Sequence, residues 1–230
     1  MRAGTPRFGV GGLRRFRLWA LPALALVVTL AALAWFSPLL SVREVRIDGA
    51  GEIPEEQIRE LLRVPETGSI LRIDTAAMAA RVATIPKVRS ARVQRVLPST
   101  VRVRIEPRTP VLYYDSPEGA HLLDADGIEY AIEPAPIGVP QLVTARPGGA
   151  DELTRASVVV ARVLPPALEV QVETIRAAGP SEISLTLRDG RTVLWGSSED
   201  GERKSAVVLP LLTRPGTVFD VSSPSLVTVK

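Results

Sequence analysis

The chain has 230 residues, a formal net charge of +3 and no cysteine. The lack of cysteine excludes disulfides, zinc–thiolate sites and a cysteine nucleophile. Five arginines and no acidic residue occupy residues 1–17, so the positive charge is concentrated at one end of a nearly neutral chain. This distribution indicates a membrane-targeted N-terminus rather than a nucleic-acid-binding protein.

A segment without charged residues, Leu18–Phe36, predicts a transmembrane helix over residues 18–37. Nineteen residues at about 1.5 Å each span roughly 28 Å, which is close to the hydrocarbon thickness of a bilayer. Trp19 and Trp35 stand near its ends, where aromatic rings favour the interface. The alternative is a signal peptide cleaved after Ala34, although the apolar run is longer than the roughly 7–15 residues of a signal core.

The arginines that precede this segment predict its orientation. Arg14, Arg15 and Arg17 lie directly before the apolar run. By the positive-inside rule they keep residues 1–17 as a cytoplasmic tail. The bulk of the chain is therefore expected outside the membrane.

Residues 41–108 predict a small sheet covered on one face by two helices, in the order β-α-α-β-β. A strand is expected to begin at residues 42–47, where Val45 and Ile47 alternate with Glu44, Arg46 and Asp48, as in a half-buried strand. Pro54 and Asp74 are suited to begin the two helices, and Pro86 is expected to end the second. Two strands complete the unit, at residues 88–96 and 100–106.

Residues 109–230 predict a mostly β domain with two helices. One helix begins at Asp151 and is stopped by Pro165-Pro166, and the other covers Glu202–Leu212. Asp189-Gly190 is a strong signal for a hairpin between two strands. The strands are expected at residues 111–114, 170–175, 183–187, 192–195, 218–221 and 226–229.

Several short motifs follow one another in a characteristic order. They are VRIDG at 45–49, PKVRSARV at 86–93, RVLPSTVRV at 95–103, EPR at 106–108, LDADG at 123–127 and Lys204 before an apolar helix. Placed after a single predicted span, this set resembles the FtsQ/DivIB family of bacterial cell-division proteins. The resemblance implies a POTRA domain over residues 41–108 and an FtsQ-type β domain over residues 109–230.

The same resemblance implies a role. Members of the family are non-enzymatic scaffolds of the divisome that bind FtsB/DivIC-like and FtsL-like proteins outside the membrane. They link early division assembly to septal peptidoglycan synthesis, so this chain is expected in the cell membrane at the septum. The alternatives are a POTRA-bearing chaperone or secretion-assembly component of the envelope and, if the apolar segment is cleaved, a secreted enzyme.

The C-terminus is the expected partner-binding site. A strand at the edge of a sheet has unpaired N–H and C=O groups that a partner strand can bond, and the family docks FtsB/DivIC at the matching segment. Phe219 is expected as the apolar anchor and Lys204 as the partner of an acidic residue, unless Phe219 and Val221 belong to the core. The full set is Lys204, Val218, Phe219, Asp220, Val221, Leu226, Val227, Thr228 and Val229.

No motif predicts catalysis, a cofactor, a metal site or a small-molecule substrate. His121 is the single histidine and is expected to be an ordinary loop residue, because one histidine without cysteine supplies too few ligands for a zinc site. It would complete a catalytic triad only with well-placed partners. Asp124 and Asp126 lack the further acidic residues of a calcium loop and predict a turn.

Basic residues are concentrated between Arg81 and Arg108, where Glu106 is the single acidic residue. We interpret them as the solvated outer face of an antiparallel strand pair. The alternative is a surface that meets an acidic partner or anionic lipid headgroups close to the predicted span.

Overall fold

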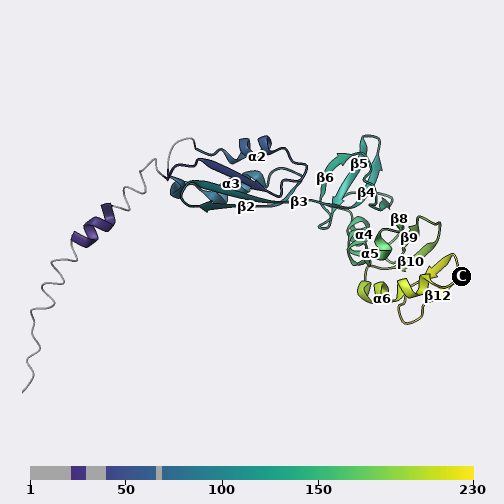
Figure 1. Cartoon of the computed structure of the whole chain (residues 1–230). Coiled ribbons are helices and arrows are strands. Elements are labelled where there is room, and N and C mark those ends of the chain that lie inside the picture. Colours follow the sequence, from purple (N-terminus) through teal and green to yellow (C-terminus); the bar gives the residue numbers. More distant parts are fainter. Residues whose placement is uncertain (1–21, 30–39, 66–68) are drawn as a thin grey trace, which may run out of the picture. The chain divides into compact units, whose positions relative to one another are not determined.

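The computed structural model describes residues 22–29, 40–65 and 69–230. Two compact units divide the chain, one ending at Pro107 and the other covering Arg108–Lys230 (Figure 1). Residues 22–29 form a helix inside the predicted span, whereas the rest of that span and Arg14, Arg15 and Arg17 lie outside the described residues. Each helix within the described ranges falls short of the length and apolarity that crossing a bilayer requires.

The first unit contains a three-stranded sheet in the order β1-β3-β2. The strands are β1 (Glu44–Asp48), β2 (Val88–Val96) and β3 (Thr100–Pro107). β3 runs antiparallel to β2 and parallel to β1. Since a parallel pair needs a long crossover, two α-helices and a short 3₁₀ helix, η2, lie in the chain between the parallel strands. They are α2 (Glu55–Leu62), η2 (Ile70–Arg72) and α3 (Thr75–Val82).

The predicted β-α-α-β-β order is thus confirmed, with one boundary corrected. Asp74 caps α3 as expected, because its carboxylate accepts the backbone N–H groups of Ala76 and Ala77, each at 3.0 Å. The helix ends at Val82 instead of continuing to Pro86. The Thr84 hydroxyl bonds the Arg81 carbonyl at 2.7 Å, and such a local bond satisfies an orphan carbonyl of the last turn.

One face of this sheet carries the core of the unit. Alternate residues of β3 point toward the helices and are buried, while the residues between them face solvent. The buried set combines Ile58, Leu62, Met78 and Val82 of the helices with Val93, Val101, Val103 and Ile105 of the sheet. Arg92 of β2 and Arg102 and Arg104 of β3 alternate with these positions, whereas Arg95 follows Val93 by two residues and lies on the same face as the core.

The second unit contains a nine-stranded sheet in the order β12-β11-β10-β9-β8-β7-β4-β5-β6. Three neighbouring pairs are parallel: β10 with β11, β7 with β8, and β4 with β7. Helices lie in the crossovers of the first two pairs, and β5 and β6 lie in that of the third. The strands are β4 (Pro110–Ser116), β5 (Gly119–Asp124), β6 (Glu129–Glu133), β7 (Gln141–Val143), β8 (Val172–Ala177), β9 (Ile183–Leu187), β10 (Thr192–Gly196), β11 (Val218–Asp220) and β12 (Thr228–Val229).

The described helices of this unit are α4 (Glu152–Val163), α5 (Pro166–Glu169) and α6 (Gly201–Leu212). The prediction of two helices was therefore wrong by one. Pro165-Pro166 does end α4, but Pro166 also occupies the first position of α5, where its missing N–H costs nothing. α6 continues to Leu212, two residues beyond Pro210.

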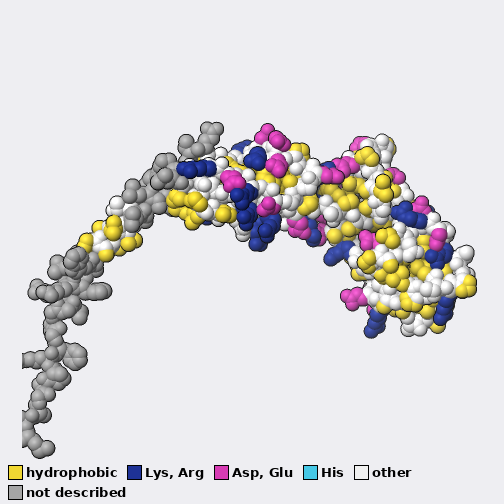
Figure 2. Space-filling view, in the orientation of Figure 1, with side chains coloured by type: hydrophobic (Ala, Val, Ile, Leu, Met, Phe, Trp, Pro, Cys, Tyr) yellow, Lys and Arg dark blue, Asp and Glu magenta, His cyan; other side chains and the backbone are white. Residues whose placement is uncertain are grey.

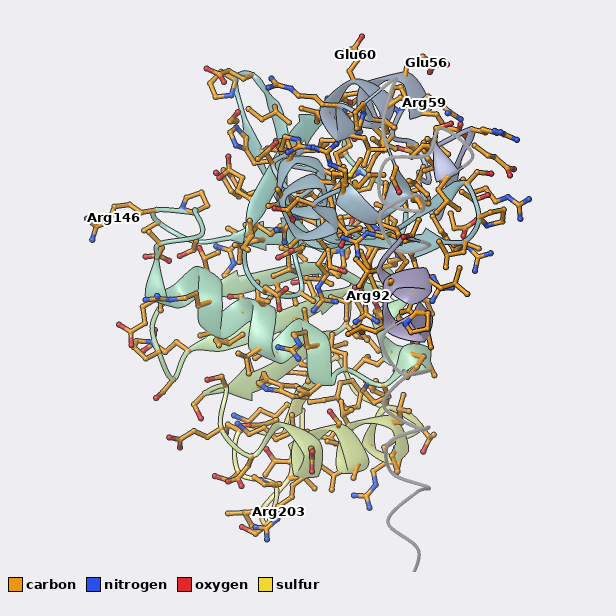
Figure 3. All side chains as sticks on the ribbon, turned by 90° about the vertical axis from the view of Figure 1, so that its left-hand side faces the viewer. Glu56, Arg59, Glu60, Arg92, Arg146 and Arg203 are labelled. Atoms are coloured by element: carbon orange, nitrogen blue, oxygen red, sulfur yellow. The ribbon has the colours of Figure 1, made fainter. Side chains whose placement is uncertain are left out.

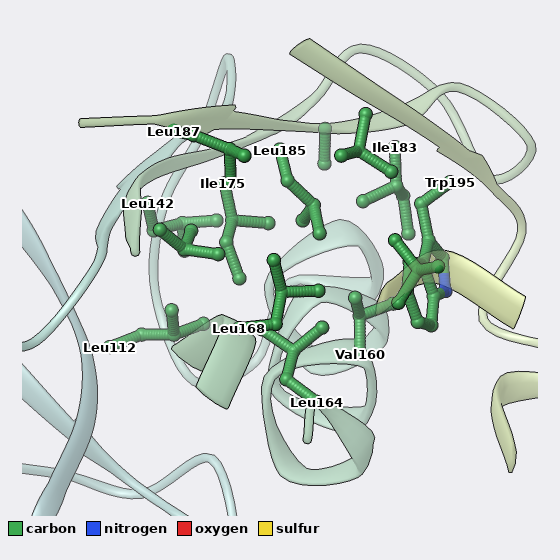
Figure 4. Packing of buried hydrophobic residues seen from close by; sticks show 14 of the residues in the cluster. Leu112, Leu142, Val160, Leu164, Leu168, Ile175, Ile183, Leu185, Leu187 and Trp195 are labelled. Atoms are coloured by element: carbon green, nitrogen blue, oxygen red, sulfur yellow. The ribbon is translucent and has the colours of Figure 1, made fainter. Parts of the chain in front are cut away.

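The core of the β domain lies between the sheet and these helices. Leu168 of α5 and Val160 of α4 point toward Ile175 and Leu185 on the sheet (Figure 4). Trp195 of β10 is fully buried in the same cluster. Burying each such aliphatic side chain contributes roughly 1.5–3 kcal/mol, so this cluster stabilises the packing of the helices on the sheet.

Candidate partner-binding edge

The C-terminal segment forms one edge of the nine-stranded sheet. β12 runs antiparallel to β11, with Val229 opposite Phe219 and Thr228 opposite Asp220. Beyond these pairs, Lys230 N–H donates to Val218 O at 2.9 Å and Val218 N–H donates to Lys230 O at 3.0 Å. The last residues of the chain are therefore held against β11 by backbone hydrogen bonds.

The outer side of β12 is open. In an antiparallel ladder, residues alternate between hydrogen-bonded and non-hydrogen-bonded pairs. Val218 and Lys230 form a bonded pair, so the N–H and C=O of Val229 point away from β11. Among the residues that the structure describes, β12 is the terminal strand and no other strand pairs with this side. Its backbone groups are thus available to an added strand.

Gly216 allows the chain end to lie this close. Its φ is +154°, and a Cβ at this position would lie 2.3 Å from Val229 Cγ1 and 3.0 Å from Lys230 O. Both distances are shorter than van der Waals contact. A side chain at position 216 would therefore displace β12.

The structure places several predicted site residues inside the domain. β11 is an interior strand between β10 and β12, and Phe219 and Val221 are fully buried. Arg191 covers the Phe219 ring, with its guanidinium carbon 5.7 Å from the ring centroid. The expectation that the Phe219 side chain anchors a partner is therefore corrected: it packs in the core, which was the alternative for Phe219 and Val221.

Lys204 is also buried, with 1% of its surface exposed. Its ammonium donates to the Ser197 carbonyl at 2.8 Å, and burial lowers its pKa. Helical periodicity explains this position, because Lys204, Val208 and Leu211 share the inward face of α6. The expected pairing of Lys204 with an acidic partner residue is thus corrected by its place in the interior.

The remaining predicted residues lie at or near the surface. Leu226 is 74% exposed and Thr228 is exposed, whereas Val227 and Val229 pack partly against the core. Val218 is half-buried. The Asp220 carboxylate accepts the backbone N–H of Ser222 at 2.9 Å and its hydroxyl at 2.6 Å, and so holds the loop that leads to β12.

A cavity of about 540 Å³ lies between α6 and this loop. Its lining comprises Asp200, Arg203, Ala206, Val207 and residues 222–225. Arg203 points away from the ribbon of α6 (Figure 3) and is exposed. Arg203 is therefore a surface cation beside the loop that leads to β12. The predicted site does not include it, although the helical phase of α6 indicates its exposure.

Comparison with known proteins identifies the family. The model of the POTRA domain of FtsQ type matches residues 40–108. Cell division protein FtsQ of Mycolicibacterium smegmatis is 44% identical over 226 residues, which cover 98% of this chain and 68% of that protein. Its counterpart in Corynebacterium glutamicum is 30% identical over 207 residues, or 89% of this chain and 93% of that protein. The chain belongs to the FtsQ/DivIB family.

The predicted resemblance to FtsQ/DivIB is thereby confirmed, and the chain is a cell-division protein with an FtsQ-type POTRA domain. FtsQ of Mycobacterium tuberculosis is similarly related, at 42% identity over 214 residues. Those residues cover 93% of this chain and 68% of that protein.

The β domain of this FtsQ-family chain contains a polar network that the sequence does not predict. His121 lies on β5 and not in a loop, and its ring stacks on Tyr114 with centroids 4.7 Å apart. His121 Nε2 lies 2.9 Å from Ser116 Oγ, and Nδ1 lies 2.7 Å from Glu129 Oε1. Tyr114 donates to Glu129 Oε2 at 2.6 Å.

This Ser–His–Glu arrangement has the hydrogen-bond order of a catalytic triad, but Ser116 has a different task. Its hydroxyl donates to Gly119 O at 3.1 Å and accepts the Glu118 N–H at 3.1 Å, so it closes the β4–β5 hairpin. Burial raises the pKa of Tyr114, and the bond to Glu129 adds to this shift. Burial of Glu129 opposes its ionisation, but hydrogen bonds from Tyr114 and His121 outweigh it and lower its pKa.

Asp124 stabilises the turn between β5 and β6. Its carboxylate accepts the backbone N–H groups of Asp126 at 2.9 Å and Ile128 at 2.8 Å, and it forms an ion pair with Arg108. The predicted turn at this position is confirmed, since residues 125–127 form the turn between β5 and β6.

Proposed function

We propose that this chain is a single-pass, non-enzymatic scaffold of the division machinery that binds FtsB/DivIC-like and FtsL-like proteins outside the membrane. The observation that carries the proposal is the open outer side of β12, at the end of a nine-stranded sheet. Family membership supports the division role. In this proposal the protein connects early division assembly to septal peptidoglycan synthesis and acts at the septum.

The partner adds a strand to β12. Its backbone bonds the outward N–H and C=O of Val229, which supplies affinity with little dependence on sequence. Specificity then comes from side chains beside the edge. Leu226, at 74% exposed, offers apolar contact, and Arg203 beside the cavity attracts an acidic residue of the partner.

The N-terminus anchors the chain on the outer side of the membrane. In the proposal, residues 18–37 cross the bilayer and Arg14, Arg15 and Arg17 keep the tail in the cytoplasm. The support is the uncharged run of Leu18–Phe36 behind a tail without acidic residues.

The test is to image an N-terminally tagged full chain in growing cells, together with a chain that ends at Ser225. The full chain should form a midcell band and recruit the FtsB/DivIC-like partner. The shorter chain lacks β12 but keeps Phe219 and Val221 in the core, so it should reach the membrane without recruiting the partner. An even membrane distribution of the full chain would contradict the proposal and favour a POTRA-bearing chaperone.

A further inference from the structure

The turn between β2 and β3 exposes a large apolar side chain. Val96 pairs with Thr100 across the hairpin, and residues 97–99 form its tip. Leu97 at this tip is 62% exposed. A single exposed leucine is ordinary on a protein surface, so its surroundings decide whether it has a role.

Those surroundings are basic. Arg43 N–H donates to Ser99 O at 2.8 Å, which places Arg43 beside the tip. Arg95, near the end of β2, precedes Leu97 by two residues. Its guanidinium donates to the carbonyl of Ile73, the residue that follows Arg72 in the chain. All three arginines are exposed, and among the described residues neither Arg43 nor Arg72 forms an ion pair. Figure 2 shows Lys and Arg side chains beside apolar ones over this unit.

Within residues 40–65 and 69–107, the acidic residues near the tip are already engaged. The Glu44 carboxylate pairs with Arg46 at 2.7 Å and accepts the Thr100 hydroxyl at 3.3 Å. Asp74 uses its carboxylate to cap α3. The local field at the tip is therefore positive, and it favours an anionic surface.

The chain length places this tip near the proposed membrane span. Arg43 is six residue steps from position 37, and an extended chain of six steps reaches at most roughly 22 Å. Ser99 is bonded directly to Arg43, so the tip is limited to nearly the same distance. This step rests on the single-pass anchor of the proposed function.

We propose that Arg43, Arg72, Arg95 and Leu97 form a lipid-contacting tip that docks on the outer leaflet of the membrane. The arginines bond the phosphates of anionic phospholipids, and Leu97 enters the boundary between headgroups and acyl chains. Contact at a second point, in addition to the span, orients the POTRA unit against the bilayer. The ligand is an anionic phospholipid surface.

A matched pair of arginines lies elsewhere on the same sheet. Arg92 and Arg104 are directly opposite each other on β2 and β3, and both are exposed. They are four residues along the strands from the Val96–Thr100 pair, or roughly 13 Å at about 3.3 Å per residue. That distance exceeds the Debye length of about 8 Å at physiological salt, so these arginines should contribute little at the tip.

The test places a fluorophore at the tip of the full chain. Because the chain has no cysteine, Leu97→Cys provides a unique site for an environment-sensitive label, and Leu226→Cys provides a reference on the β domain. The labelled chains are reconstituted into phosphatidylcholine vesicles with and without phosphatidylglycerol, and nitroxide-bearing lipids serve as the quencher. We expect quenching at position 97 in anionic vesicles and little at position 226.

Reversing the charge of the arginines tests whether they cause the quenching at position 97. Arg43→Glu with Arg72→Glu should lower the quenching at position 97 by roughly twofold or more, whereas Arg92→Glu with Arg104→Glu should leave it nearly unchanged. A label at position 97 that stays in water while the chain resists alkaline extraction would overturn the lipid contact alone. A chain that alkaline extraction removes from the vesicles would refute the anchor, and the lipid contact with it.

Discussion

Val229 of β12 lies directly opposite Phe219 of β11, and the two residues have different roles at the C-terminal edge. Phe219 is fully buried and holds β11 in the core. Val229 turns its backbone N–H and C=O outward. The interior strand β11 therefore supports an edge strand whose outward backbone groups no strand of the described residues pairs with.

Gly216→Ala should displace β12. The added Cβ would lie 2.3 Å from Val229 Cγ1, and φ at this position is +154°. We expect a loss of about 1–3 kcal/mol in the free energy of unfolding, measured by urea denaturation, together with weaker partner binding. Gly148→Ala is the matched control, because Gly148 has φ +152° and nothing within 4 Å of the added Cβ. Equal losses in both variants would contradict the role of Gly216 in seating β12.

Leu226→Asp should weaken partner binding and leave the fold intact. Leu226 is 74% exposed, so its replacement removes a surface contact and no core packing. We expect a loss of about tenfold or more in affinity for the FtsB/DivIC-like partner, measured by titration of the full chain in detergent. Val170→Asp is the control, because the Val170 side chain is apolar and similarly exposed, at 66% of its surface. This variant should bind the partner normally. Unchanged affinity in Leu226→Asp would exclude this side chain from the interface.

The buried Lys204 should cause the free energy of unfolding to increase at alkaline pH. Burial lowers the pKa of its ammonium in the folded state below the ordinary value of 10.5, so between these two pKa values the unfolded chain binds more protons. The free energy of unfolding of the natural chain should therefore increase relative to Lys204→Met as the pH rises toward 10.5. Urea denaturation at pH 7 and pH 10 measures this. Parallel pH profiles for the two chains would contradict the prediction.

The ionised Glu129 carboxylate should stabilise the folded state, and this stabilisation should be lost in acid. Hydrogen bonds from Tyr114 and His121 outweigh the effect of burial and lower the pKa of its carboxyl group in the folded state below 4.5. The contribution is therefore present above about pH 4.5 and disappears as the pH falls through the folded value. Thermal unfolding between pH 3 and 7 should show a steeper acid loss in the natural chain than in Glu129→Gln. Glu118→Gln, which changes an exposed carboxylate of the adjacent turn, should behave like the natural chain.

The sequence predicts the POTRA unit well because its signals are local. Apolar and charged residues alternate along β3, and Asp74 marks the start of α3, so strand and helix follow from short stretches of sequence. The β5 strand is missed because Ala120, Leu122 and Leu123 are all buried, which removes the alternation. β7 is three residues long, too short for periodicity to detect.

The partner-binding edge is only partly predictable, because strand order is a long-range property. β11 joins the sheet parallel to β10 through the crossover helix α6, and this pairing makes Phe219 an interior residue. Position in the chain alone favours an edge strand at residues 218–221. The phase of α6, in contrast, is visible in the sequence and distinguishes the buried Lys204 from the exposed Arg203.

The most direct test of partner addition at β12 is amide hydrogen exchange of the full chain with and without the FtsB/DivIC-like partner. The Val229 N–H faces outward, so its exchange should slow markedly when a partner strand bonds it. The Lys230 N–H already donates to Val218 O at 2.9 Å and serves as the internal reference. Slower exchange at Val229 would support strand addition, whereas a bound partner that leaves the Val229 exchange rate unchanged would contradict it.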